Sequence, residues 1–218
     1  MLTLDNRLKT AAALCRSGGV VCDVGTDHAL LACYLAKNGA KEVIASDIND
    51  GPLESARRTV EQEGCDNVCV LKSDGLQQIG YADDVIICGM GGELIADIIA
   101  GCRFLTKDTR FILQPMTKAE ILRRRLYADG FEILEERTAY DGKRAYVVML
   151  AAFTGERCDV DDIFALTGKV SDRRFLELTA QKLLKNASRM DESESFAEDS
   201  ARLRSLAEAI IKRAEELS

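Results

Sequence analysis

The stretch Val20-Val-Cys-Asp-Val-Gly-Thr-Asp-His28 joins a β-branched apolar run, a single glycine and the start of a helical pattern. An apolar run that ends at a glycine is typical of a buried strand. The segment 29–38 that follows has the spacing of apolar residues expected for a helix. The stretch therefore predicts a strand-turn-helix unit, the building block of a largely parallel sheet.

The same alternation of strand and helix continues as far as Leu150. Four more strands are predicted at residues 42–46, 68–71, 84–88 and 110–113, and three more helices at 52–63, 94–99 and 118–129. Strands at 131–135 and 145–150 flank a turn at 140–143 and predict a closing antiparallel hairpin. We predict an α/β fold, a Rossmann-like doubly wound sheet with an antiparallel edge hairpin. This is the topology of class I methyltransferases, although other doubly wound folds also permit an antiparallel edge strand.

After Gly155 the strand pattern ends and two long amphipathic segments follow. The first covers residues 171–190 and the second begins near Phe196, each with apolar residues every three or four positions. The acidic stretch 191–195 between them predicts a turn. We expect two domains, residues 1–155 for cofactor binding and residues 156–218 as a coiled-coil-like α-helical hairpin.

Composition excludes several classes of protein. The N-terminal residues lack the apolar core of an export signal, and charged residues interrupt every apolar stretch before membrane-spanning length. Eight cysteines form no C-x-x-C pair and only one histidine is present, so we expect reduced thiols and no metal site. We expect a cytoplasmic protein that does not bind membranes.

The distribution of charge gives opposing indications about whether the protein binds nucleic acid. A net charge of −7 argues against it, because affinity for nucleic acid comes largely from lysine and arginine contacts to phosphate. The segment 169–189, however, has a local charge of +4. A solvated helix face explains such a cluster equally well. The candidate RNA contacts in this segment are Arg173, Arg174, Lys182, Lys185 and Arg189.

The glycine turn after the first strand distinguishes between cofactors. A dinucleotide-binding turn carries G-x-G-x-x-G, but here Gly25 is the first glycine and Asp27 stands in place of the second. A carboxylate at that position would repel a pyrophosphate. S-adenosylmethionine has no phosphate and presents a cationic ammonium and sulfonium, which suit Asp23 and Asp27. We therefore predict that Asp23, Gly25 and Thr26 bind this cofactor; an acidic turn that only caps the helix is the alternative.

Acidic residues also follow the second and third strands. Asp47 lies twenty-four residues after Asp23, where doubly wound folds place the carboxylate that accepts the ribose hydroxyls. We include its neighbour Ile48 in the predicted cofactor site. Asp74 and Gly75 follow the third strand, where methyltransferases commonly place a carboxylate near the cofactor adenine.

Two further strand ends contribute candidates. The segment Gly89-Met90-Gly91-Gly92 follows the fourth strand, and its glycines would let the backbone approach the cofactor and a flat base. A flexible turn is the alternative for this segment. Gln114 and Pro115 follow the fifth strand, where a side-chain amide at the site and a simple helix-entry turn are equally good explanations.

Together these motifs resemble the bacterial tRNA adenine-N1 methyltransferases that modify adenine 22. One departure is Met116, where that family tends to carry a polar residue. The resemblance implies S-adenosylmethionine as donor, tRNA as partner and a C-terminal hairpin that contacts tRNA, with Arg7 and Gln114 as further substrate contacts. The motifs that carry it are Arg7–Lys9, Asp23–His28, Asp74–Leu76, Gly89–Gly92, Leu113–Pro115, Asp141–Lys143 and the C-terminal hairpin.

For such a reaction we assign Asp27 and His28 as the catalytic candidates. Adenine N1 has a free lone pair near neutral pH, so the enzyme needs alignment more than a strong base. Asp27 would accept a hydrogen bond from the N6 amino group as positive charge develops, with His28 as the alternative. The base must leave its stack, and we expect Met90 or Tyr34 to help hold it.

Two other functions remain open at this point. One is methylation of a protein or small metabolite, with the hairpin as a dimer or partner contact, which labelling of total tRNA would separate from tRNA methylation. The other is a non-enzymatic binding protein, which would not bind the donor. We expect a monomer.

Overall fold

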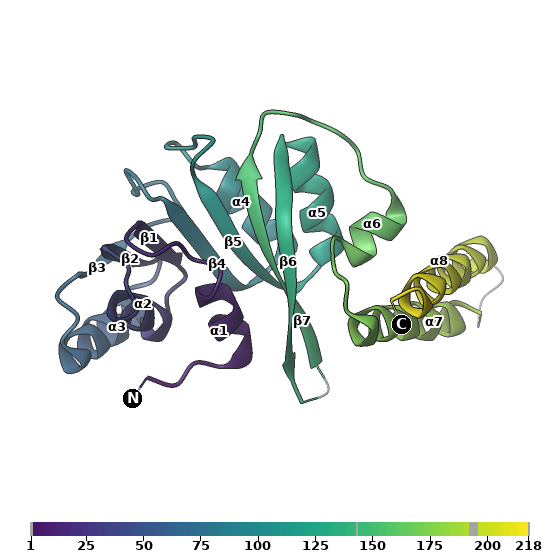
Figure 1. Ribbon diagram of the computed structural model, residues 1–218, viewed down its shortest axis with the longest axis horizontal. Helices are drawn as coiled ribbons and strands as arrows, with labels where there is room; N and C mark the ends of the chain where they lie inside the picture. Colours follow the sequence, from purple (N-terminus) through teal and green to yellow (C-terminus); the bar gives the residue numbers. More distant parts are fainter. Residues whose placement is uncertain (1, 143, 192–195, 218) are drawn as a thin grey trace. The chain divides into compact units, whose positions relative to one another are not determined.

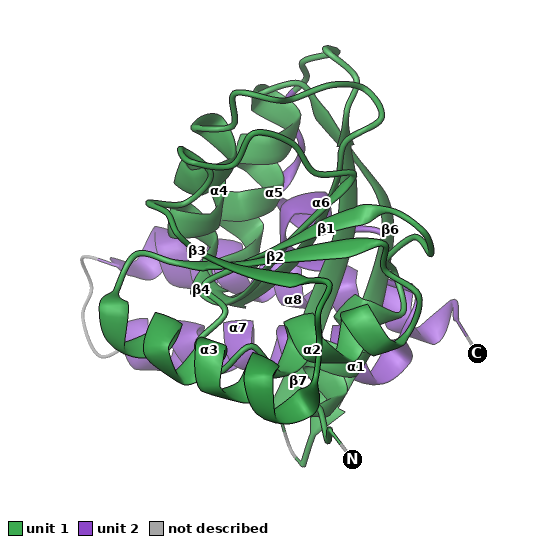
Figure 2. Cartoon of the chain, turned by 90° about the vertical axis from the view of Figure 1, so that its left-hand side faces the viewer, with its two compact units in different colours: residues 1–158 green, residues 159–218 purple. Residues whose placement is uncertain are grey.

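The structure is a computed structural model that describes residues 2–142, 144–191 and 196–217 (Figure 1). The chain divides into two compact units, residues 1–158 and 159–218 (Figure 2). The division into functional domains at residue 155 stays a prediction. Within the described ranges, no helix combines the length and apolar character that crossing a membrane requires.

Unit 1 is built on a seven-stranded sheet with the order β3-β2-β1-β4-β5-β7-β6. Strands β1 to β5 are parallel, and β7 is antiparallel to both β5 and β6. This arrangement confirms the predicted doubly wound sheet with an antiparallel edge hairpin. The strands are β1 Val20–Val24, β2 Glu42–Asp47, β3 Val68–Lys72, β4 Asp84–Gly91, β5 Arg110–Thr117, β6 Phe131–Asp141 and β7 Arg144–Phe153.

Helices cover both faces of this sheet. Helices α1, α2 and α3 lie on one face, and α4 and α5 lie on the other (Figure 2). Gly64, in the left-handed conformation with φ of 62°, ends α3 as predicted, because glycine adopts this conformation without steric cost. The helices are α1 Asn6–Ala12, α2 Leu30–Lys37, α3 Asp50–Glu63, α4 Gly92–Ala100 and α5 Ala119–Ala128.

Strands β4 and β5 are longer than predicted. We expected them to end at Cys88 and Leu113, but they run through Gly91 and Thr117. The ladder continues past irregularities between Cys88 and Met90 and between Met90 and Gly91. The glycine-rich segment is therefore mostly a bulged strand end, since glycine lets a strand bend while its neighbours keep pairing.

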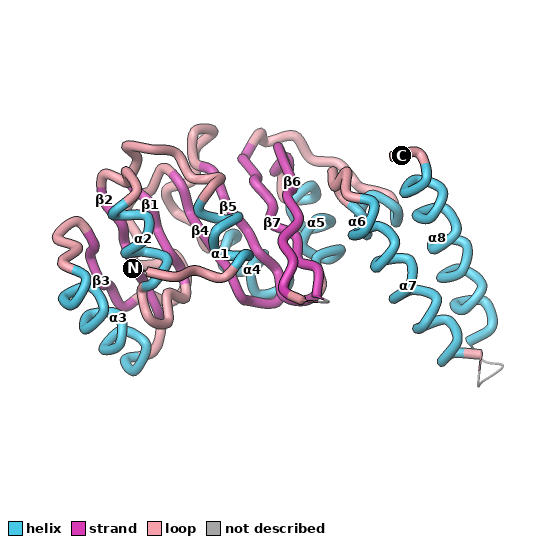
Figure 3. Tube along the Cα trace, turned by 60° about the horizontal axis from the view of Figure 1, so that its bottom comes forward, coloured by secondary structure: helices cyan, strands magenta, loops and turns pink. Residues whose placement is uncertain are grey.

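Unit 2 is helical and contains α6 Asp162–Thr167, α7 Arg173–Met190 and α8 Ala197–Glu215. Helices α7 and α8 lie side by side (Figure 3) and bury small and aliphatic side chains, which confirms the predicted hairpin. Of the predicted turn at 191–195, residues 192–195 lie outside the described part of the chain. Helix α6 was not predicted, although Asp161 provides a recognisable N-cap by accepting a hydrogen bond from the Phe164 amide at 2.7 Å.

Candidate active site

The turn after β1 has a conformation that requires glycine. Gly25 has φ of +76°, and a Cβ atom at this position would lie 2.3 Å from the Cε atom of Met90. The amides of Gly25 and Thr26 both donate to the carbonyl of Ser46, at 2.8 and 3.0 Å. The end of β1 is therefore joined to the end of β2, and the positive φ of Gly25 favours glycine, since a side chain there would be strained and would also displace the Met90 methyl group.

Asp23 lies directly before this turn and is 4% exposed. Its Oδ2 atom accepts a hydrogen bond from Thr26 Oγ1 at 2.7 Å. Burial raises the pKa of Asp23 to about 6, and the Thr26 hydrogen bond opposes that rise. Among the described residues, no lysine or arginine forms an ion pair with this carboxylate. A buried carboxylate without a cation favours a positively charged ligand.

A cavity of about 300 Å³ opens beside Asp23. This volume is at the lower end of the range for small-molecule sites in proteins. Arg7 and Leu8 of α1 and Leu30 and Leu31 of α2 form part of its wall. The structure brings together here seven of the predicted site residues: Arg7, Asp23, Gly25, Thr26, Asp27, His28 and Gly89.

Asp27 and His28 line the same cavity but are exposed to solvent. Their side chains are 73% and 59% exposed, and His28 Nε2 lies 3.5 Å from Asp27 Oδ2. Asp27 has φ of +47° and Ala29 has φ of +52°. Two left-handed residues without a glycine form a strained turn, and such turns cluster at functional sites.

Asp47 is the last residue of β2 and Asp74 follows β3, the next two strands in the sheet after β1. Asp47 is half-buried, and its Oδ1 atom accepts a hydrogen bond from the Asn49 amide at 2.8 Å. Asp74 is exposed, and its Oδ2 atom accepts a hydrogen bond from Gln77 Nε2 at 3.2 Å. Neither lines the 300 Å³ cavity, so their part in cofactor binding stays a prediction.

The remaining cofactor candidates occupy different settings. Ile48 is 52% exposed after β2. Gly75 has φ of +55°, and a Cβ atom there would lie 3.2 Å from Ile98. Met90 packs its methyl group over Gly25, and Gly91 forms the end of β4.

Comparisons with known proteins agree with this geometry. Residues 4–149 match the family model described as a methyltransferase domain. Over 180 residues the chain is 39% identical to the tRNA (adenine(22)-N(1))-methyltransferase of Bacillus subtilis, an alignment that covers 80% of this chain and 75% of that protein. The chain belongs to this methyltransferase family.

Solved structures extend the likeness over the whole chain. The Bacillus subtilis m1A22 tRNA methyltransferase superposes with a TM-score of 0.77 at 30% identity, covering 100% of this chain and 99% of that one. A Streptococcus pneumoniae protein in complex with S-adenosyl-L-methionine shares the fold, with a TM-score of 0.81 at 24% identity and coverage of 96% and 100%.

A ribosomal protein L11 methyltransferase from Thermoanaerobacter pseudethanolicus is 32% identical over 122 residues, but this alignment covers 54% of this chain and only 39% of that protein. The alternative of a protein substrate is therefore not favoured.

Two of the predicted tRNA contacts in this methyltransferase contact each other. Arg7 Nη1 donates to Gln114 Oε1 at 2.6 Å, and the Gly89 amide donates to the same oxygen at 3.2 Å. Arg7 also donates to the carboxylate of Asp5 and lies over the ring of Tyr146. Sequence reasoning missed Asp5 and Tyr146; the N-cap position of Asp5 was a usable signal, whereas nothing in the sequence pointed to Tyr146.

Tyr34 lies apart from the catalytic candidates. It lines a second cavity of about 160 Å³, together with Lys9 and Asn38. That cavity shares no lining residue with the one that contains Asp27. Met90 does not line the cavity either, but its methyl group lies against Gly25, which does; a role of Met90 or Tyr34 in holding the base stays a prediction.

Apart from Arg7, the basic residues predicted to contact RNA belong to α7 of the methyltransferase. They are exposed, whereas Leu176, Ala180 and Leu183 of the same helix are buried. Arg173 Nε donates to Glu177 Oε1 at 2.8 Å, so part of its charge is compensated locally. The exposed basic residues are Arg173, Arg174, Lys182, Lys185 and Arg189.

The cysteines of the described chain are free thiols. Burial raises the pKa of Cys22 to about 12, and burial also raises the pKa of Cys88, which lines the cavity. Both thiols stay protonated at neutral pH, which suppresses nucleophilic and metal-binding chemistry. Within the described ranges, no group of three histidine, cysteine or acidic side chains is arranged to hold a metal ion.

Proposed function

We propose that this chain methylates N1 of adenine 22 in tRNA, with S-adenosylmethionine as the methyl donor. The observation that carries the proposal is the buried Asp23 carboxylate, which has no ion-pair partner among the described residues, beside a turn whose Gly25 has a φ of +76°. The family membership supplies the substrate, because the curated relative is a tRNA (adenine(22)-N(1))-methyltransferase.

The residues present fit the donor. Asp23, which lacks a cation among the described residues, suits the donor's ammonium group, and charge neutralisation offsets the cost of burying the carboxylate. We assign Asp47 to the ribose hydroxyls and Asp74 to the adenine amino group, since they lie at the carboxyl ends of β2 and β3, the two strands next to β1 in the sheet order. S-adenosylmethionine, when bound, supplies an electrophilic methyl group.

The acceptor side relies on alignment. Adenine N1 already presents a lone pair, so the protein must hold the base in line and stabilise the positive charge that methylation creates. Asp27 lines the cavity and is mostly exposed, so a base arriving from solvent can reach it. Its carboxylate accepts a hydrogen bond from the N6 amino group in this proposal, with His28 as the alternative.

Unit 2 provides the contacts to the tRNA backbone in this proposal. The exposed basic residues of α7 would approach phosphates, and each contact releases counterions, so binding weakens as salt rises. Replacing Lys182 and Lys185 with alanine should lower the slope of log affinity against log salt by about 2.

In this proposal the reaction takes place in the cytoplasm, and the chain acts as a monomer.

The decisive experiment locates the methyl group. The protein is incubated with labelled donor and an unmodified tRNA transcript, and primer extension is then run on the product. We expect label in the RNA and a stop at position 22, because N1 methylation blocks the pairing edge. A matched transcript with guanine at position 22 should take up no label. Label that persists in that transcript, or label without a stop, contradicts the proposal.

Variants separate donor binding from chemistry. Asp47→Ala should weaken donor binding, measured by calorimetry without RNA. Asp27→Ala should bind the donor normally and lower turnover by about 100-fold. Equal losses of donor affinity in both variants would show that Asp27 belongs to the donor site instead.

A further inference from the structure

The Arg7 guanidinium is held at both ends within unit 1. Nη1 donates to Gln114 Oε1 at 2.6 Å and contacts Met116 Sδ at 3.4 Å, while Nη2 donates to Asp5 Oδ2 at 2.6 Å. The Arg7 Cζ atom lies 5.4 Å from the centre of the Tyr146 ring, within cation–π range. A guanidinium engaged in this way is poorly suited to bind a tRNA phosphate.

Gln114 connects this guanidinium to the wall of the cavity. The side chain is fully buried, its Oε1 atom accepts from both Arg7 and the Gly89 amide, and its Nε2 atom donates to the Pro115 carbonyl at 3.0 Å. With both ends of the amide in use, the side chain has one satisfied orientation. Gln114 therefore couples helix α1 to Gly89, at the bulge of β4.

Gly89 lies at an irregularity in the pairing of β4 with β5. The register shifts between Cys88 and Met90, and the Gly89 amide donates its hydrogen bond to the Gln114 side chain. With φ of +83°, it adopts a conformation that glycine leaves easily, because no side chain restricts its rotation. The hydrogen bond that the Gly89 amide donates to Gln114 thus fixes the backbone of a residue that lines the cavity.

We propose that Arg7 and Gln114 are a positioning pair for the methyl donor, and that neither contacts tRNA. Arg7 orients the Gln114 amide, and the Gln114 oxygen holds the backbone of Gly89, at the bulge of β4, in the shape that admits the donor. The inference rests on the proposed function, because the donor is S-adenosylmethionine. It replaces the role in tRNA binding predicted for both residues from the sequence.

The proposal is tested by calorimetry of S-adenosylmethionine binding without RNA, below the melting transition of each variant. Arg7→Met and Gln114→Leu should each weaken donor binding about tenfold, as expected for one lost charged or buried hydrogen bond. The double variant should also lose about tenfold, since each change breaks the same link. Gln114→Glu should weaken donor binding less than Gln114→Leu, because a carboxylate still accepts from Arg7 and Gly89 although it loses the hydrogen bond that Nε2 donates to the Pro115 carbonyl.

Arg58→Met is the matched control, because Arg58 is exposed on α3 and does not line the cavity. Its donor affinity should equal that of the unaltered protein. Steady-state kinetics with tRNA complete the test. Arg7→Met and Gln114→Leu should each raise KM for the donor and leave KM for tRNA unchanged.

Three outcomes would overturn the positioning role. Normal donor affinity in Arg7→Met, with a raised KM for tRNA and a salt slope lowered by about 1, would make Arg7 a phosphate contact. A lower melting temperature with normal donor affinity would make the pair merely structural. Additive losses in the double variant would separate the two residues. By contrast, no donor binding by the unaltered protein would overturn the proposed function itself.

Discussion

Asp23 and Asp84 are both buried aspartates on neighbouring parallel strands, β1 and β4. Asp23 lies near the carboxyl end of β1, whereas Asp84 is the first residue of β4. At the edge where β4 begins, Asp84 accepts hydrogen bonds from Arg16 Nε at 3.0 Å and from Arg110 Nε and Nη2 at 2.9 and 2.8 Å. At the edge where β1 ends, Asp23 accepts a hydrogen bond from the hydroxyl of Thr26.

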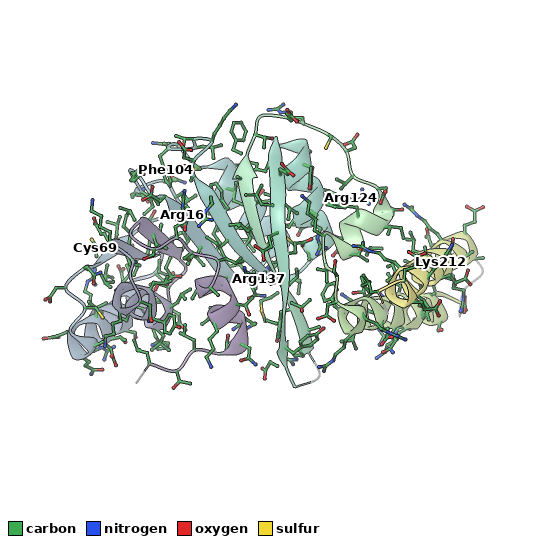
Figure 4. The ribbon with its side chains drawn as sticks, viewed as in Figure 1. Arg16, Cys69, Phe104, Arg124, Arg137 and Lys212 are labelled. Carbon is green, nitrogen blue, oxygen red and sulfur yellow. The ribbon has the colours of Figure 1, made fainter. Side chains whose placement is uncertain are left out.

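The different compensation of the two buried carboxylates indicates which of them faces a ligand site. Ionised carboxylates are costly to bury, so each requires compensation. The protein supplies it to Asp84 with two arginines, one of which, Arg16, is labelled in Figure 4. It supplies Asp23 with a single hydrogen bond and a cavity. A buried acid without a cation of its own therefore marks a site for a positively charged molecule, whereas a fully paired acid is part of the scaffold.

Asp84→Asn should have the largest effect and should act on stability. Removing the charge leaves two partly buried guanidiniums without their partner, and we expect a loss of about 3 kcal/mol in the free energy of unfolding. Urea denaturation measures this loss. The folded fraction should bind the donor normally, and a variant as stable as the unaltered protein would contradict the scaffold role of Asp84.

Asp23→Asn should change stability in the opposite direction. Burial raises the pKa of Asp23 from 3.8 to about 6, so the folded state binds more protons than the unfolded state between these values. Stability therefore falls as pH rises through this window, and the penalty is complete above pH 6. Asparagine cannot ionise, so the variant should gain up to about 3 kcal/mol at pH 7.5, the equivalent of this pKa shift. It should also bind the donor about 100-fold more weakly; unchanged affinity would refute the ligand role.

The pH dependence of donor binding gives a third measure. Asp23 must be ionised to pair with the donor's ammonium, and protons compete for it as pH falls through 6. Calorimetry should show an affinity about tenfold lower at pH 5 than at pH 7. Asp23→Asn should show a flat profile over this interval, and a matching decline in that variant would assign the pH effect to another group.

Thr26→Val should have the smallest effect. The Thr26 hydroxyl donates to Asp23 and lowers its pKa, so the variant should raise that pKa above about 6. Donor affinity at pH 6.5 should fall about threefold to tenfold, and the midpoint of the pH profile should move upward. A midpoint that stays in place would show that Thr26 does not tune the carboxylate.

Much of the fold was predictable because it depends on local patterns. Short β-branched runs alternating with helical periods predicted the seven strands and the two terminal helices, since each period reflects one buried face. The predicted ends of β4 and β5 were wrong because pairing between strands carried both past their glycine and proline residues. Helix α6 escaped prediction because it has only six residues, too few for a helical period to show.

The functional site was likewise only partly predictable from the sequence. The glycine turn with its acidic neighbours was visible in the sequence, and the structure places Asp23, Asp27 and Gly89 around one cavity. The link between Arg7 and Gln114 was not visible, because these residues are 107 positions apart and each alone resembles an ordinary surface or turn residue.

The sequence by itself determined the family, the parallel sheet and the chemistry of the turn, because spacing and residue type along a short stretch are enough to specify these. Only the tertiary structure decided which buried aspartate receives arginines and which faces a cavity. Both are acids at the ends of apolar strands, and the distinction lies in what the folded chain brings beside each one. Compensation of a buried charge is a property of three-dimensional neighbours, and those neighbours come from distant parts of the chain.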